Sequence, residues 1–136
     1  MPPPFSVSQF ISRLEPGTHF EQLISCVPGL NYFAKDRAGR FAMMDEGFIA
    51  MLGCKHRNEV LGKTDFDFFP KIIAEKFVAD DHQVMQTGRP IHNLSEPVPN
   101  NDMTFSWWLV NKVPLRDRRR KIVGLAGVMT DRKSVV

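Results

Sequence analysis

The order of helix and strand patterns along this sequence predicts an α+β fold built on a five-stranded antiparallel sheet. The strand patterns form an early pair and a later trio: 30–36, 40–45, 90–98, 103–117 and 121–131. Helical patterns fill 46–87, so helices and strands do not alternate as they would in a doubly wound α/β protein. The length of 136 residues favours one domain. We therefore expect the inserted helices to pack together on one face of the sheet.

Two short helices are predicted before the first strand. The first lies within 5–17, where Ser6 and Gln9 have the spacing of a capping box. The second lies within 18–29 and begins with a similar pair. A Pro-Gly dipeptide ends each of them. These helices are expected to flank the sheet.

The elements that follow have clear boundaries. Gly39 can adopt the positive φ that a tight hairpin between the first two strands requires. A short helix is predicted within 46–54. The longest helical pattern, 71–87, ends at Gly88, with a proline shortly after it. This helix is expected to cover the sheet.

The strand at 103–117 has two faces that differ in polarity. One face is the more apolar and carries Phe105, Trp107, Leu109, Asn111, Val113 and Leu115. The other carries Thr104, Ser106, Trp108, Val110 and Lys112. Because side chains alternate along a strand, the first face is predicted to point into the core. The second face is partly apolar as well, so the N-terminal helices or a partner subunit should cover it.

Four phrases of this sequence, taken together in their order, resemble a known family. They are "GKTDFDFFP", "DDHQVMQTGRP", "NKVPLRD" and "IVGLAGVMTDRK". They resemble a PAS domain, and more narrowly the PAS sensor that precedes the helix-turn-helix region of AraC-type bacterial transcription regulators. The resemblance implies a flanking segment at 1–19, a sensor domain at 20–133 and the start of a connector at 134–136. A histidine kinase or a diguanylate cyclase could follow a similar sensor.

The resemblance implies a pocket between the sheet and the helices, which in PAS domains holds a cofactor, a small metabolite or nothing. The first hypothesis is that an unknown small molecule binds in it. The residues expected to line it are Met43, Phe48, Phe66, Phe69, Phe77, Trp107, Leu109 and Asn111. Asn111 would supply a polar contact on the inward face of a central strand. Ordinary core packing is the alternative for the apolar members, and a satisfied buried amide is the alternative for Asn111.

A purely structural dimerisation module is the competing hypothesis. Its contact surface would combine the first helix with the second face of the long strand: Phe10, Ile11, Leu14, Trp108 and Val110. The two hypotheses are compatible, because PAS-type sensors often form homodimers. A downstream DNA-binding effector, absent from this chain, would receive the signal.

The residues do not favour a bound cofactor or an enzyme. Cys54 lacks the neighbours of a flavin-reactive cysteine, and His82 falls beyond the apolar stripe of the 71–87 helix, where a haem ligand would be needed. No histidines or cysteines have metal-ligand spacing. Neither a phosphate-binding loop nor a nucleophile motif occurs.

Three carboxylates and one basic run have structural interpretations that compete with functional ones. Asp81 falls inside the apolar stripe, so it should be hydrogen-bonded or ion-paired rather than in direct contact with a ligand. Asp65 and Asp67 are expected to cap backbone N–H groups. The run at 116–121, "RDRRRK", reads as a solvated hairpin turn and not as a nucleic-acid site. The sequence has no transmembrane run and no disulfide framework, so we expect a cytoplasmic protein with no membrane contact.

Overall fold

The computed structural model describes residues 1–15, 18–100 and 102–131, without the side chains of residues 18–20. Five strands form one sheet in the order β2-β1-β5-β4-β3. Their bounds are β1 Leu30–Asp36, β2 Phe41–Met44, β3 Ile91–Pro99, β4 Phe105–Arg116 and β5 Ile122–Asp131. Every neighbouring pair is antiparallel. The predicted α+β fold and the five-stranded antiparallel sheet are confirmed.

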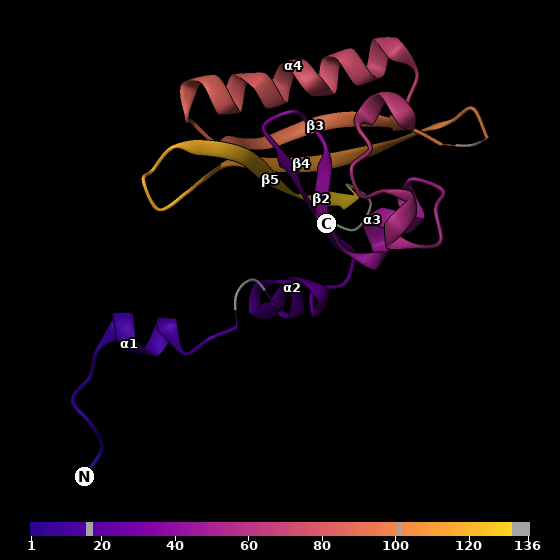
Figure 1. Ribbon diagram of the computed structural model, residues 1–136. Helices are drawn as coiled ribbons and strands as arrows, with labels where there is room; N and C mark the ends of the chain where they lie inside the picture. The colour runs from indigo at the N-terminus through magenta and orange to yellow at the C-terminus, as the bar shows by residue number, and fades with distance from the viewer. Residues whose placement is uncertain (16–17, 101, 132–136) are drawn as a thin grey trace.

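The segment between β2 and β3 forms a helical layer on one face of the sheet (Figure 1). It contains α3 (Glu46–Met51), the short 3-10 helices η1 (Arg57–Glu59) and η2 (Asp65–Asp67), and α4 (Lys71–Thr87). The main core lies between this layer and the sheet, and includes Phe33, Phe48, Phe77, Val110 and Met129. We call this face of the sheet the inner face and the opposite one the outer face.

The local sequence explains why α4 spans this layer. Its buried side chains, Ala74, Phe77, Asp81, Val84 and Met85, recur at helical spacing along one stripe. Gly88 follows the last turn with φ 68°, a left-handed conformation that ends the helix as the sequence predicts. The stripe packs on the inner face, and Asp81 is the one charged residue in it.

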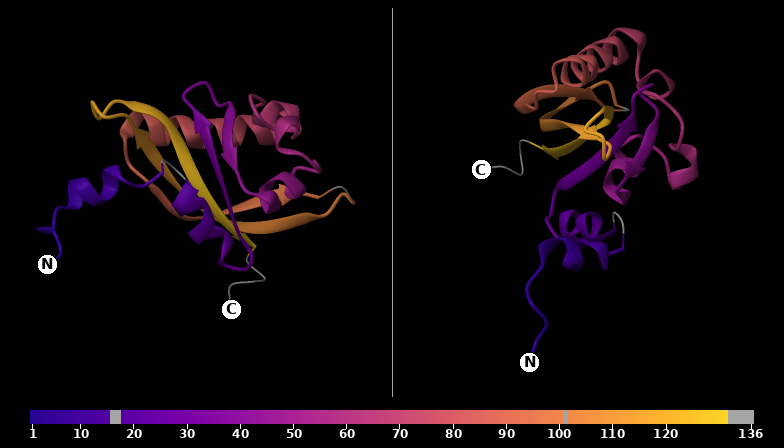
Figure 2. Two further views of the ribbon diagram at one scale, coloured as in Figure 1. Left: turned by 60° about the horizontal axis from the view of Figure 1, so that its bottom comes forward. Right: turned by 60° about the vertical axis from the view of Figure 1, so that its left-hand side comes forward.

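The two N-terminal helices lie away from this layer. The helix α2 (Thr18–Ser25) precedes β1 and lies across the outer face of the sheet, and α1 (Val7–Ser12) lies still further from it (Figures 1 and 2). The predicted N-cap is present in α1, where the backbone N–H of Gln9 donates to Ser6 Oγ at 3.4 Å. No residue of α1 is buried. Among the described residues, no helix is long and apolar enough to cross a membrane.

The predicted orientation of β4 is wrong. Val110 and Lys112 are buried at 1% and 2% exposure, whereas Trp107 on the opposite face is 50% exposed. The inner face of β4 therefore carries Trp108, Val110 and Lys112, and the outer face carries Trp107, Leu109 and Asn111. The sequence misleads here because a charged side chain, Lys112, belongs to the core. The ion pairs that make its burial possible come from other elements of the chain.

The predicted connector at 134–136 and the end of the predicted sensor domain at Lys133 lie outside the described residues. The strand that precedes them, β5, runs through the centre of the sheet between β1 and β4. A displacement of the helical layer would therefore reach β5 directly, since Leu125 and Met129 belong to the two core clusters.

Candidate functional site

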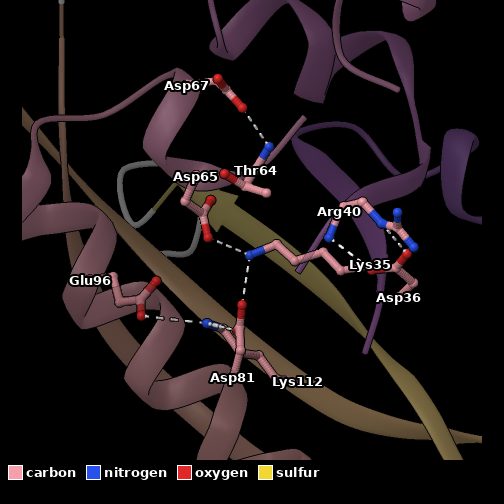
Figure 3. Close-up of polar contacts among 9 residues, drawn as sticks. All are labelled: Lys35, Asp36, Arg40, Thr64, Asp65, Asp67, Asp81, Glu96 and Lys112. Carbon is pink, nitrogen blue, oxygen red and sulfur yellow. Dashed lines mark hydrogen bonds and ion pairs between the residues drawn. The ribbon is translucent and has the colours of Figure 1, made fainter. Parts of the chain in front are cut away.

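A network of buried ion pairs lies between α4 and the inner face of the sheet (Figure 3). Lys35 Nζ is 2.6 Å from Asp65 Oδ2 and 2.6 Å from Asp81 Oδ2. Lys112 Nζ is 2.8 Å from Asp81 Oδ1 and 3.9 Å from Glu96 Oε1. All five residues are buried. We call these residues the buried charge network.

Each member of the network comes from a different element. Lys35 lies on β1, Lys112 on β4 and Glu96 on β3, while Asp65 opens η2 and Asp81 lies midway along α4. Asp81 accepts hydrogen bonds from both lysines with its two oxygens. One carboxylate thereby joins the longest helix to both ends of the strand order β1-β5-β4.

Burial and pairing compete in setting the protonation of the network. Burial would raise the pKa of Asp81, but the ammonium groups of Lys35 and Lys112 outweigh burial and hold that pKa below its usual range. Burial prevails at Asp65 and raises its pKa despite the contact with Lys35. Burial would lower the pKa of Lys112, but Asp81 and Glu96 raise it. Asp81 and Lys112 therefore stabilise each other's charged forms, as buried charges require.

Glu96 is the member with the poorest pairing. Burial raises the pKa of Glu96 to about 7, and a hydrogen bond shared with the carboxyl group of Asp80 adds to that shift. Its Oε1 atom is fully enclosed and has no hydrogen-bond partner among the described residues. The 3.9 Å separation from Lys112 Nζ is too long for a hydrogen bond. Glu96 thus carries an oxygen that the described residues leave without a hydrogen-bond partner.

The network forms the polar wall of a small cavity in the core, the inner cavity. The residues that line it are Phe33, Lys35, Phe41, Phe48, Met51, Asp65, Phe69, Phe77, Glu96, Val98, Val110, Lys112 and Met129. Its free volume is about 30 Å³. That volume holds one or two water molecules, so a larger guest requires the lining side chains to move. Two methionines in the wall, Met51 and Met129, have the flexible side chains that allow this.

A second, larger space lies on the outer face. This outer groove has a volume of about 490 Å³. The helix α2 borders it with Glu21 and Ile24. The sheet supplies the rest: Tyr32, Phe33, Ala34, Met43, Asn111, Val113, Leu115, Ala126, Gly127 and Val128. The lining is almost entirely apolar, in contrast to the charged inner cavity.

The absence of a side chain at Gly127 allows the ring of Phe33 to pack closely against β5. A Cβ atom at Gly127 would lie 2.5 Å from the ring of Phe33. The Phe33 ring in turn contacts that of Phe48, with their centroids 5.3 Å apart. A side chain at 127 would therefore displace part of the cavity wall.

The structure separates the residues predicted for the pocket into two groups. Phe48, Phe69 and Phe77 line the inner cavity. Met43 and Asn111 line the outer groove instead. Asn111 is therefore not an inward polar contact, and its side-chain oxygen accepts a hydrogen bond from the backbone N–H of Asn93 at 3.0 Å.

The remaining pocket candidates lie away from the inner cavity. Phe66 is 50% exposed, and Trp107 and Leu109 lie on the outer face of β4. Trp107 and Leu109 lie there because β4 has the opposite orientation to the one predicted. None of the three residues lines the inner cavity.

The residues predicted for the dimer surface also fall on two sides of the molecule. Phe10, Ile11 and Leu14 are exposed, as that hypothesis requires. Trp108 and Val110 instead belong to the inner core or pack against it, so the sheet part of the predicted surface is wrong. The exposed sheet residues nearest the outer groove are Met43 and Val113.

The predicted roles of the acidic residues are partly right. Asp81 is ion-paired, as its place in the apolar stripe predicts. Asp67 accepts from the backbone N–H of Thr64 at 2.9 Å, which is a capping contact. Asp65 is different, because its carboxylate pairs with Lys35 inside the core.

Sequence reasoning missed Lys35, Lys112 and Glu96 as site residues. Lys35 follows a run of apolar residues in a strand that is buried on both faces, which is the available signal. Lys112 and Glu96 carry no such signal, because each lies among polar or exposed neighbours in sequence. Their proximity arises only when β3 pairs with β4.

The described residues offer little support for a metal site, a haem ligand or a reactive thiol. No group of three or more His, Cys, Asp or Glu side chains there could hold a metal ion. His82 lies on the exposed side of α4, beside Arg37 and Gln86 in a shallow surface depression. Burial raises the pKa of the Cys54 thiol, which disfavours the reactive thiolate.

Comparison with known proteins assigns the chain to a family. The family model described as the PAS fold matches residues 29–136, most of the chain, so the chain belongs to the PAS-fold family. It is a PAS sensor domain. No curated protein matches it.

Solved structures extend this result. The chain is similar to VqmA in the Vibrio cholerae VqmA–ligand–DNA complex, with 25% identity, a TM-score of 0.71 and coverage of 86% of this chain and 52% of VqmA. It is similar to VqmA bound to DPO, with 25% identity, a TM-score of 0.71 and coverage of 84% and 56%. The PAS domain of the histidine kinase ThkA matches at 15% identity and a TM-score of 0.60, with coverage of 75% and 99%, and shows the fold alone. The chain spans about half the length of the VqmA proteins.

Proposed function

We propose that this chain is the ligand-sensing part of a transcription regulator and that its small-molecule site is the inner cavity. The observation that carries the proposal is the buried charge network, which places lysine and carboxylate groups beside aromatic rings at the centre of a sensor fold. Cavities that combine apolar walls with a few fixed polar groups are typical small-molecule sites. The likeness to VqmA, which is bound to a ligand and to DNA in one structure, supports the same reading.

The signal would pass from the cavity to the end of the chain through the sheet. A ligand changes the output only if it binds one packing arrangement more tightly than another. The cavity wall includes Met129 on β5, the strand that leads to the chain's last residues. Displacement of the aromatic wall by a ligand would therefore shift β5 and the segment that follows it. A DNA-binding effector is the proposed receiver, and a histidine kinase is the alternative.

The test is ligand-induced stabilisation, with DPO as the first probe and a collection of small metabolites as the second. A ligand that binds only the folded state raises the thermal midpoint by mass action. Val110→Phe fills the inner cavity and should abolish that rise. The matched control is Val113→Phe, on the outer face of the same strand, which should keep it.

Circular dichroism on both variants checks that the fold survives, because overpacking a core costs about 1–3 kcal/mol. Stabilisation by a probe that persists in Val110→Phe and disappears in Val113→Phe would move the site to the outer groove. Absence of stabilisation by DPO and by every metabolite tested would overturn the proposal of a small-molecule sensor.

Dimerisation through the outer face is a second candidate function, favoured by a separate observation. The outer groove is a large apolar space, and the apolar side chains of α1 are exposed, among them Phe10 at 64% and Ile11 at 59%. Exposed apolar surfaces of this kind mark interaction sites. We propose that a second copy of the chain covers it.

Sedimentation equilibrium tests this candidate. Met43→Glu or Val113→Glu places a charge at the groove and should weaken the dimer by tenfold or more. The control is Ile72→Glu, which charges an exposed apolar position on α4, across the sheet from the groove. A monomeric wild-type protein at high micromolar concentration, or a dimer weakened only by the α4 variant, would contradict the outer-face interface.

A further inference from the structure

The buried charge network contains one carboxyl group more than its lysines neutralise. Lys35 and Lys112 supply two positive charges, and Asp65 and Asp81 contact them within 2.8 Å. Glu96 is the third acid and lies 3.9 Å from the nearer lysine. In the described part of the chain the remaining charged groups near it are Asp80 and Lys76, and Lys76 is 3.6 Å from Asp80. Glu96 therefore has no lysine within hydrogen-bond distance, and its carboxyl group shares a hydrogen bond with that of Asp80.

The side chain of Glu96 lines the space where a ligand would lie. Glu96 is 3% exposed and lines the inner cavity. Its Oε1 atom has no hydrogen-bond partner among the described residues. A buried acceptor without a donor costs about 1–3 kcal/mol, and more when it is charged. A guest that brings a donor to this atom recovers that cost.

The aromatic part of the cavity wall selects for a flat, apolar body. The rings of Phe69 and Phe77 pack edge to face with centroids 5.1 Å apart, and Phe33, Phe41 and Phe48 form a second cluster. Aromatic guests gain from such walls through edge-to-face and stacked contacts. A donor group on an aromatic ring meets both requirements of the cavity.

We propose that the inner cavity takes a small aromatic molecule with an amino or ring N–H group that donates a hydrogen bond to Glu96 Oε1. The nitrogen lies against the unpaired carboxyl oxygen, and the ring lies among the phenylalanines. The excess acid in the network favours a nitrogen that is positively charged or strongly polarised. This assignment rests on the proposed function, since it names the chemistry of the ligand at the same site.

A pair of matched probes tests the assignment. The two molecules 2-aminopyridine and 2-methylpyridine have nearly the same shape, but only the first carries amino donors. We expect 2-aminopyridine to bind the wild-type protein at least tenfold more tightly, the effect of one hydrogen bond to a charged group. Titration of ¹⁵N-labelled protein measures both affinities and shows which amides respond. Responses should concentrate on β3, β4 and α4, around the inner cavity.

The variant Glu96→Gln should reduce the difference between the two probes to less than about threefold, because its neutral amide accepts more weakly than a carboxylate. The control Glu75→Gln removes an exposed carboxylate from α4 and should leave the difference unchanged. Equal binding of the two probes to the wild type would overturn the donor assignment and leave the sensor proposal standing. Failure of both probes to perturb the cavity would overturn this assignment, whereas the sensor proposal is decided by the stabilisation experiment with DPO and the metabolites. If Glu96→Gln does not fold, the wild-type pair alone decides.

Discussion

At the scale of single residues, Asp81 is the carboxylate on which the core depends. It accepts from Lys35 at 2.6 Å and from Lys112 at 2.8 Å, and no other residue described in the structure bonds both lysines. Removal of one partner from a buried ion pair is strongly destabilising, because the other charge is left uncompensated. We therefore expect Asp81 to contribute more to stability than any surface carboxylate of α4.

Asp81→Asn should lower the free energy of unfolding by about 3 kcal/mol, as measured by urea denaturation near neutral pH. The control Glu75→Gln should change it by less than about 0.5 kcal/mol, because that residue forms only an exposed pair with Lys71. The pKa of Asp81 is lowered in the folded protein. Its contribution is therefore present above the ordinary aspartate range and is lost as the pH falls through the lowered value. Equal stabilities of the two variants would contradict this role.

Glu96 should give the protein a pH dependence of the opposite sign. Its pKa is raised from 4.5 to about 7 on folding. Between these values the folded protein holds a proton that the unfolded chain has lost, so stability falls as the pH rises from 4.5 to 7. The groups that face Glu96 are Lys112 on β4 with Asp80 and Lys76 on α4.

Glu96→Gln should flatten this part of the stability profile and should stabilise the protein at pH 8 by about 1–3 kcal/mol. Thermal midpoints recorded from pH 5 to pH 8 provide the measurement. The wild-type midpoint should fall across that interval more steeply than that of the variant. Parallel profiles would show that Glu96 titrates normally in the folded protein.

At the scale of elements, β4 decides which side of the sheet carries the site. Its neighbours Trp107 and Trp108 point to opposite faces, the first half exposed and the second packed against the inner core. The two faces are similar in apolar content because the structure covers both, one with α4 and the other in part with α2. The alternation of side chains along β4 therefore predicts correctly which residues share a face, but it does not show which face points into the core.

Alanine substitutions at the two tryptophans test the orientation. Trp108→Ala should lower the free energy of unfolding by about 3 kcal/mol, because it removes a large side chain from the core. Trp107→Ala should lower it by less than about 1 kcal/mol in the monomer, since that side chain is half exposed and lies outside the core. Chemical denaturation at low protein concentration makes the comparison. A larger loss of stability in Trp107→Ala than in Trp108→Ala would contradict the orientation of β4 in the structure and would support the one predicted from the sequence.

Sequence periodicity predicts the elements well and the site only in part. The helix 71–87 and its end at Gly88 follow from a continuous apolar stripe and a glycine, both of which are local signals. Asp81 is predictable as a paired carboxylate because it interrupts that stripe. Its partners Lys35 and Lys112 are not predictable, because they come close only when β1, β5 and β4 assemble into one sheet.

At the scale of the whole molecule, the protein places two different surfaces on the two faces of one sheet. The inner face holds a small charged cavity, and the outer face holds a larger apolar groove. The central strand β5 contributes to both, with Met129 on one side and Val128 on the other. A change in the packing of the inner cavity can therefore alter the surface that a second copy of the chain would cover.

Fluorine NMR of protein labelled with 4-fluorophenylalanine tests the inner site most directly, with DPO and small aromatic amines as probes at millimolar concentration. Five labelled rings line the cavity: Phe33, Phe41, Phe48, Phe69 and Phe77. Exposed Phe5, Phe10, Phe66 and Phe105 serve as internal controls. A saturable shift of the cavity signals, with the exposed signals unmoved, is the predicted result. Signals from the five cavity rings that stay unchanged with every probe would contradict a ligand site on the inner face.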